Sequence, residues 1–113
     1  MHRSGADEDN MTPEDFLCDF CGSCWREDRP MVEGHRGSLI CGPCLAMSFR
    51  ELWLAPGGEE LPEHAVCTLC LSHNGDPVWR SPVTETATVC KRCSKHSVVM
   101  LERDPELGWK RPS

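Results

Sequence analysis

Eight of the nine cysteines in this chain form four C-x2-C pairs, and the pairs repeat along the sequence. The first set is Cys18, Cys21, Cys41 and Cys44, and the second set is Cys67, Cys70, Cys90 and Cys93. Each cysteine of the second set lies 49 residues after its counterpart in the first set. Four matches at one offset indicate a single module written twice in tandem.

Zinc explains the spacing of these cysteines. A zinc ion takes four ligands in a tetrahedron, about 2.3 Å from each sulfur, and a C-x2-C pair presents two thiolates to one ion. In each module 19 residues separate the two pairs, which is the interval of a closed four-cysteine site. We therefore expect two structural zinc ions per chain. Iron is a chemically possible occupant of four thiolates, and the alternative without metal is a set of buried or disulfide-bonded cysteines.

The composition also indicates that the fold needs stabilisation by metal ions or disulfides. Leu, Ile, Val and Phe make up under a fifth of the 113 residues, a share typical of disordered chains. A domain of this size with so little apolar material needs disulfides or metals. The polar, acidic N-terminal residues lack the apolar segment of a secretory signal, and no apolar run approaches the roughly 18 residues of a membrane span. We therefore expect a reducing, cytoplasmic compartment, where paired cysteines favour metal over disulfides.

Cys24 is the ninth cysteine, and it forms a further C-x2-C pair with Cys21. The repeat places His73 at the equivalent position of the second module, which argues against Cys24 as a regular ligand. Two interpretations stay open: a spare small side chain, or a redox-active or alternative ligand. His64 and His73 flank the first pair of the second module but compete weakly with four cysteines.

The segments around the cysteines of the first module predict a hairpin and a helix. Apolar residues on either side of Gly34 and Gly37 indicate a short β-hairpin over residues 31–40. Apolar side chains then recur with the spacing of one helix face after the second pair. They are Leu45, Phe49, Leu52 and Trp53. The Pro-Gly-Gly run at 56–58 ends this helix.

The second module repeats the same order less clearly. Residues 77–79 and 87–89 are the expected strands, and residues 94–103 the expected helix, with Val98 and Leu101 facing inward. A pair of ligands, a hairpin and a helix that carries the last ligands is the order of a treble clef. The predicted fold is therefore a small, metal-stabilised α+β fold of two tandem treble-clef-like four-cysteine zinc fingers.

These elements define the expected domain organisation. The composition predicts a disordered acidic tail over 1–14, zinc module one over 15–55, a Pro-, Gly- and Glu-rich linker over 56–66, zinc module two over 67–103, and a C-terminal tail over 104–113.

Residues 16–53 combine the four cysteines of the first set with Phe20, Gly22 and Ile40. In these residues module one resembles the four-cysteine zinc-binding domain at the N-terminus of the ClpX unfoldase. The resemblance implies a treble-clef fold, a tendency to dimerise, and the binding of adaptor or substrate proteins. Module two is a degenerate copy that keeps its four cysteines and little else. Because the chain has no G-x-x-x-x-G-K-[ST] loop, the resemblance does not extend to unfoldase activity.

The charge favours a protein partner over nucleic acid. The formal net charge is −6, and two zinc ions with four thiolates each bring it to about −10. A strongly acidic particle is repelled by phosphate backbones. A small basic cluster, Lys91, Arg92 and Lys95, keeps nucleic-acid binding open as an alternative.

The leading hypothesis from the sequence is a non-catalytic zinc protein that acts as a protein-protein interaction or adaptor module. Four-cysteine sites are closed, whereas a catalytic zinc keeps a position for water, so we expect no enzyme activity. Four tryptophans are candidates for a contact surface; they are Trp25, Trp53, Trp79 and Trp109. The alternatives are a small nucleic-acid-binding zinc-finger regulator and a thiol redox sensor, in which Cys24 reacts and module one releases its zinc first.

Overall fold

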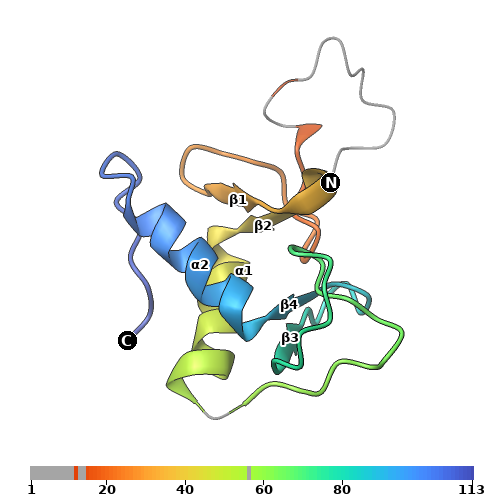
Figure 1. Ribbon diagram of the computed structural model, residues 1–113. Helices are drawn as coiled ribbons and strands as arrows, with labels where there is room; N and C mark the ends of the chain where they lie inside the picture. Colours follow the sequence, from red (N-terminus) through yellow and green to blue (C-terminus); the bar gives the residue numbers. More distant parts are fainter. Residues whose placement is uncertain (1–11, 13–14, 56) are drawn as a thin grey trace.

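The computed structural model describes residue 12, residues 15–55 and residues 57–113 (Figure 1). The predicted acidic tail lies almost entirely outside the described residues. Each module contains one hairpin and one helix, so the predicted small α+β fold is confirmed. The elements of module one are β1 Met31–Glu33, η3 His35–Gly37, β2 Leu39–Cys41, α1 Gly42–Phe49 and the π-helical turn η4 Arg50–Leu54. Those of module two are β3 Val78–Arg80, β4 Thr88–Cys90 and α2 Lys91–Glu102.

Both hairpins are antiparallel and run directly into their helices. Met31 pairs with Cys41 in the first hairpin, and Val78 pairs with Cys90 in the second. Cys41 and Cys90 are each the last residue of a strand and the extended N-cap of the following helix. The first helical turn therefore starts at a cysteine, which fixes the direction of the helix relative to the hairpin.

The repeat extends to the buried positions of the helices, which were not part of the cysteine pattern. Four buried residues of α1 and η4 have a buried counterpart 49 residues later in α2, whereas the counterparts of the buried Gly42 and Cys44 are only partly buried. The pairs are Leu45 with Ser94, Ser48 with Ser97, Phe49 with Val98, and Leu52 with Leu101. Val98 and Leu101 face inward as the periodicity predicts. The two helices thus present the same face to the core.

The first strands of the two hairpins are the exception to this offset. β3 begins 47 residues after β1, whereas β4 begins 49 residues after β2. Module two has two fewer residues between its first cysteine pair and its hairpin, and two more in the hairpin loop. The two differences cancel, so the cysteine spacing is unchanged.

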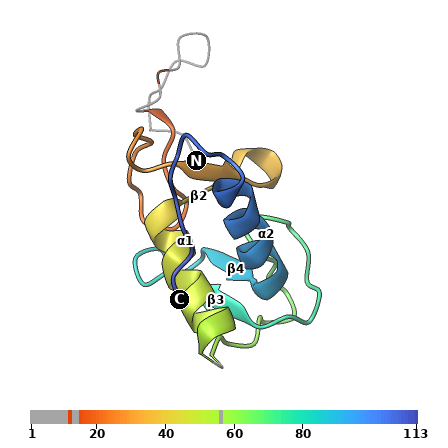
Figure 2. The ribbon, with the colours of Figure 1, turned by 90° about the vertical axis from the view of Figure 1, so that its left-hand side faces the viewer.

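The two modules pack against each other through their helices (Figure 2). The buried Oγ atoms of Ser48 and Ser94 lie 2.9 Å apart where α1 and α2 meet. The rings of Phe20 and Trp79, one from each module, also stack, with centroids 5.8 Å apart. Buried residues of both modules form one continuous apolar cluster, so the chain has a single core rather than two independent ones.

Backbone contacts between the modules are reciprocal. The carbonyl of Phe20 in module one accepts a hydrogen bond from the hydroxyl of Ser81, which begins the hairpin loop of module two. The carbonyl of Leu69, 49 residues after Phe20, accepts from the N–H of His35 at 2.7 Å. Next to it, a β-carbon on Gly34 would lie 2.6 Å from the Leu69 oxygen, so glycine is required at this close approach. The modules are therefore related by an approximate two-fold arrangement.

The segment predicted as a linker is partly built into module two. Glu59 and Val78 exchange two backbone hydrogen bonds, of 2.8 and 2.9 Å. The Glu59 carboxylate also pairs with Arg80 at 2.7 Å, and Leu61 is buried in the shared core. This part of the connection is therefore fixed to the second hairpin.

The C-terminal residues pack along the helices (Figure 2). Leu107 and Trp109 are partly buried against the core. The Arg111 guanidinium lies 5.3 Å from the Phe49 ring centroid and donates to the Glu102 carboxylate at 2.9 Å. This pairing lowers the pKa of Glu102, and the segment adds a cover to the contact between α1 and α2.

Truncation of Trp79 is expected to weaken the whole chain, because its ring stacks on Phe20 across the module boundary. Trp79→Ala should reduce the free energy of unfolding of the zinc-loaded protein by about 3–5 kcal/mol, measured by urea denaturation. Val83→Ala is the control, since Val83 is 66% exposed. A Trp79→Ala protein as stable as this control would contradict a shared core.

Candidate metal centres

The first cysteine set, here called site 1, is assembled from three parts of module one. Cys18 and Cys21 lie in the loop before the hairpin, Cys41 ends β2, and Cys44 lies in the first turn of α1. The four Sγ atoms lie within 4.8 Å of one another. The Sγ–Sγ separations of Cys18 from Cys44 and of Cys21 from Cys41 are 3.9 and 3.6 Å. A tetrahedron with 2.3 Å arms has edges of about 3.8 Å, so the cluster has the size of a zinc site.

The second set, here called site 2, has the same construction in module two. Cys67 and Cys70 come from the loop, Cys90 ends β4, and Cys93 lies in the first turn of α2. Its Sγ atoms also lie within 4.8 Å of one another, and those of Cys70 and Cys90 are 4.0 Å apart. Each predicted set of four is thus brought together by the fold.

All nine cysteines are free thiols. The Sγ separations of 3.6–4.0 Å are far longer than the roughly 2.05 Å of a disulfide. The clusters therefore have the dimensions of metal sites and not of disulfide pairs.

Backbone amides support the sulfurs in the same way in both sites. The N–H of Cys41 donates to the Sγ of Cys18 at 3.4 Å, and the N–H of Cys90 donates to the Sγ of Cys67 at 3.3 Å. The N–H of Phe20 is a second donor to Cys18, at 3.3 Å. Hydrogen bonds of this kind favour the charged thiolate, which is the form that binds metal.

Two serines beside the sulfurs also repeat, although the cysteine pattern alone did not reveal them. The Oγ of Ser23 lies 3.2 Å from the Sγ of Cys21, and the Oγ of Ser72 lies 3.0 Å from the Sγ of Cys70. Both serines sit two residues after the second cysteine of a pair, at the same offset of 49. The signal was therefore present in the sequence.

The loop that carries the first two cysteines requires a left-handed residue in both modules. Gly22 has a φ of 78° and Leu71 has a φ of 57°. Each donates its N–H to the first cysteine carbonyl of its pair, at 2.9 and 2.8 Å. Glycine adopts this conformation at little cost, whereas a branched side chain such as that of Leu71 is strained in it. The geometry of the sulfur cluster overrides the local preference of Leu71.

The crowded thiols divide their protons unequally when no cation is bound. Hydrogen bonds from Cys41 and Cys44 lower the pKa of Cys18 to about 2. The bond to Cys18 raises the pKa of Cys41 to about 12, and bonds to both neighbours raise that of Cys44 well above its ordinary value. Site 2 divides likewise, with the pKa of Cys90 lowered and that of Cys93 raised. Four thiols this close together cannot all ionise unless a cation offsets the negative charge of the thiolates. The residues present therefore fit a divalent metal.

The other candidate ligands lie outside both clusters. Cys24 is half-buried and belongs to neither group of four sulfurs. His73 lies with its Nδ1 3.2 Å from the carbonyl oxygen of Ala65, and His64 is exposed. Neither histidine joins a cluster within the described residues.

Two of the tryptophans have contrasting surroundings. Trp79 is buried on Phe20 and is not available as a contact surface. Trp53 is 37% exposed, and the ammonium groups of Lys91 and Lys95 lie 4.4 and 4.7 Å from its ring centroid. Together with Arg92 these residues line a pocket of about 470 Å³. The basic cluster predicted from the sequence therefore meets an aromatic ring.

No protein-family model matches this chain, and no curated protein and no solved structure matches it significantly. In the described part of the chain, no helix has the length and apolar character of a membrane span.

Replacement of one ligand is expected to remove one metal. Cys44→Ala should reduce the zinc content from two ions per chain to one, because three sulfurs do not close the site. Native mass spectrometry of protein expressed with zinc measures the count. Cys24→Ala should keep two ions, and its loss of a zinc would show that Cys24 is a ligand after all.

Proposed function

We propose that this chain is a non-catalytic zinc protein whose two treble-clef modules form one protein-interaction module. The proposal depends on one observation, the tetrahedral size of both four-sulfur clusters. A catalytic zinc has three protein ligands and a water, whereas a structural zinc has four protein ligands. Each bound ion would link its loop, strand and helix. The proposed ligands are Cys18, Cys21, Cys41 and Cys44 for one ion, and Cys67, Cys70, Cys90 and Cys93 for the other.

The order of elements supports the treble-clef assignment. In each module a loop supplies two ligands, a hairpin follows, and the last two ligands lie at the end of a strand and in the first turn of a helix. The resemblance of module one to the ClpX-type domain agrees with this order. Free cysteines throughout the chain favour a reducing compartment such as the cytoplasm.

The internal pairing of the modules bears on the choice of partner. The inner faces of α1 and α2 are already occupied by each other, with the Ser48–Ser94 contact between them. A second copy could use these faces only by separating the modules. We therefore favour a different protein as the partner over self-association through the helices.

Two exposed apolar side chains of module one are the proposed contact surface. Met47 on α1 and Leu54 at the end of η4 are 38% and 49% exposed. The net charge of −6 favours a partner with a neutral or basic surface.

Nucleic acid is the second candidate, because Lys91, Arg92 and Lys95 gather beside Trp53. Arg92, however, interacts with the Cys70 sulfur, which raises the pKa of its guanidinium. Both lysines already rest on the Trp53 ring. These contacts reduce the charge and the aromatic surface left for a strand of nucleic acid.

Chelation is expected to unfold the protein if the zinc ions are structural. Structural sites contribute on the order of 10 kcal/mol each at neutral pH, which exceeds the stability of a typical small domain. An excess of chelator should therefore abolish the helical circular dichroism signal, and added zinc should restore it. A metal-free chain that keeps its helices would refute the structural role.

The contact surface is tested with a double variant. Met47→Glu with Leu54→Glu should abolish binding of the protein that the parent captures in its own cell extract, without loss of zinc. Val83→Glu, at an exposed apolar residue of module two, is the control. Capture of nucleic acid instead of protein would favour the second candidate if it depends on the basic cluster. A triple variant of that cluster should then lose the nucleic acid (Lys91→Glu, Arg92→Glu and Lys95→Glu). A triple variant elsewhere should keep it (Arg26→Glu, Arg50→Glu and Lys110→Glu).

A further inference from the structure

The two metal sites differ in how well their sulfurs are covered. Cys44 of site 1 is 2% exposed, whereas its counterpart in site 2, Cys93, is half-buried. Cys70 is half-buried as well, so two of the four cysteines of site 2 are partly exposed. In site 1 only Cys21 is half-buried.

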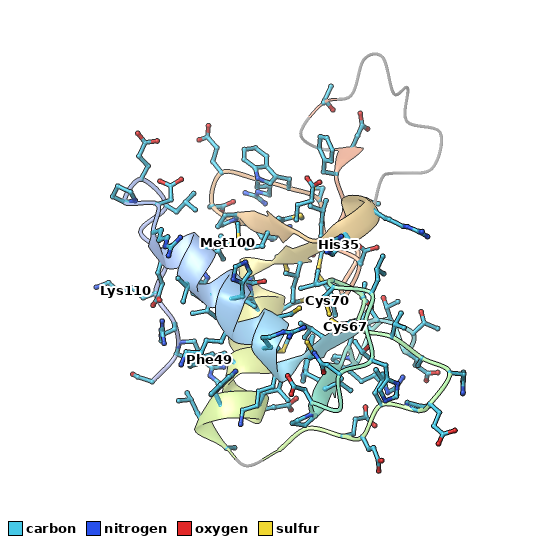
Figure 3. All side chains as sticks on the ribbon, in the orientation of Figure 1. His35, Phe49, Cys67, Cys70, Met100 and Lys110 are labelled. Atoms are coloured by element: carbon cyan, nitrogen blue, oxygen red, sulfur yellow. The ribbon has the colours of Figure 1, made fainter. Side chains whose placement is uncertain are left out.

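A pocket of about 300 Å³ is lined by Cys70 and Cys93, the two partly exposed cysteines of site 2. Its walls come from both modules. The first hairpin contributes Val32 and His35, and α2 contributes His96 and Met100. Figure 3 labels His35, Cys70 and Met100, which come from the first hairpin loop, the second cysteine loop and α2. A water molecule takes about 30 Å³ of liquid volume, so small polar molecules fit this pocket.

The approximate two-fold arrangement allows the surroundings of the two metal sites to be compared position by position. On the site 1 side, Phe20 and Trp79 stack and fill the space between the first cysteine loop and the opposite hairpin. On the site 2 side, the residues at the equivalent positions are the smaller Leu69 and Val32, and both line the pocket. Two stacked aromatic rings thus occupy these positions beside site 1, whereas two smaller side chains that line a pocket occupy them beside site 2.

We infer that site 2 is an oxidation site, at which a small peroxide converts Cys70 and Cys93 to a disulfide and so releases the metal. The inference rests on the proposed zinc at both sites. Once two sulfurs are joined, only Cys67 and Cys90 remain as ligands, and two ligands do not close a structural site. Site 1 loses its ion more slowly under the same conditions, because three of its four cysteines are buried.

The chemistry balances with hydrogen peroxide as the oxidant. One thiolate sulfur attacks a peroxide oxygen, so that an S–O bond forms, the O–O bond breaks and hydroxide leaves. The second thiolate attacks the oxidised sulfur, which forms the S–S bond and releases a second hydroxide. The two sulfurs lose two electrons in total, and the two hydroxides take protons to become two waters. These protons come from the solvent, and His35 and His96 also line the pocket.

The proposed oxidation site differs from the redox residue that the sequence suggested, which was Cys24. The redox hypothesis from the sequence centred on Cys24 and on loss of zinc from module one. Cys24 belongs to neither sulfur cluster, whereas Cys70 and Cys93 have all three requirements: mutual proximity, solvent access and a pocket.

Oxidation of the zinc-loaded full chain tests the inference. A colorimetric zinc indicator follows release during treatment with hydrogen peroxide, and alkylation followed by peptide mass spectrometry locates the oxidised cysteines. The first zinc should leave together with formation of a Cys70–Cys93 disulfide, and the second should leave at least about tenfold more slowly, since reactivity follows access. Val32→Trp should slow the first release several-fold, because it places in the pocket the ring that Trp79 provides beside site 1. Val83→Trp is the control and should behave like the parent.

Each other result decides against the inference. Equal release from both sites, earlier release from site 1, or a first disulfide that includes Cys24 would overturn it and leave the proposed structural zinc intact. A chain that carries no zinc at site 2 before oxidant is added would overturn the proposed function as well. If Val32→Trp does not fold, Met100→Trp at the exposed rim replaces it, and a rate of first release unchanged by that substitution would also count against the pocket.

Discussion

Closure of each four-sulfur cluster fixes the path of a whole module. Two sulfurs come from a loop, one from the end of a strand and one from the first turn of a helix, so a single ion would set the relative positions of all three. The backbone follows this requirement even where it is locally unfavourable, since Leu71 adopts a φ of 57° to present its cysteine pair. In a chain with so few apolar residues, metal coordination is proposed to supply what a large core supplies elsewhere.

The apolar residues that are present hold the modules to each other. Phe20 and Trp79 stack across the boundary, and the small side chains of Ser48 and Ser94 allow the helices to meet closely. The carbonyls of the two cysteine loops each accept a hydrogen bond from the opposite hairpin. The metal sites and the module interface are therefore coupled, because the loops that supply the sulfurs also make the interface.

The sequence predicted what depends on local pattern. The repeat of cysteines located both clusters, glycines around a turn located the first hairpin, and helical spacing placed Val98 and Leu101 in the core. The packing of the modules was not predictable, because it depends on which surfaces face each other and no period marks them. For the same reason Trp79 was considered a surface candidate although it is buried. The linker was identified by its composition, which does not reveal that Glu59 pairs with a strand.

The fusion of two similar modules into one chain has a consequence for how they diverge. In a symmetric homodimer every substitution appears on both sides of the interface at once. Here each module can change separately. The carbonyl of Phe20 therefore accepts a hydrogen bond from the side chain of Ser81, whereas the equivalent carbonyl of Leu69 accepts one from the backbone N–H of His35. An aromatic pair on one side and an aliphatic pair on the other are likewise compatible with one fold. The presence of two similar modules in one chain thus gives this small scaffold two copies of a site that can differ from each other independently.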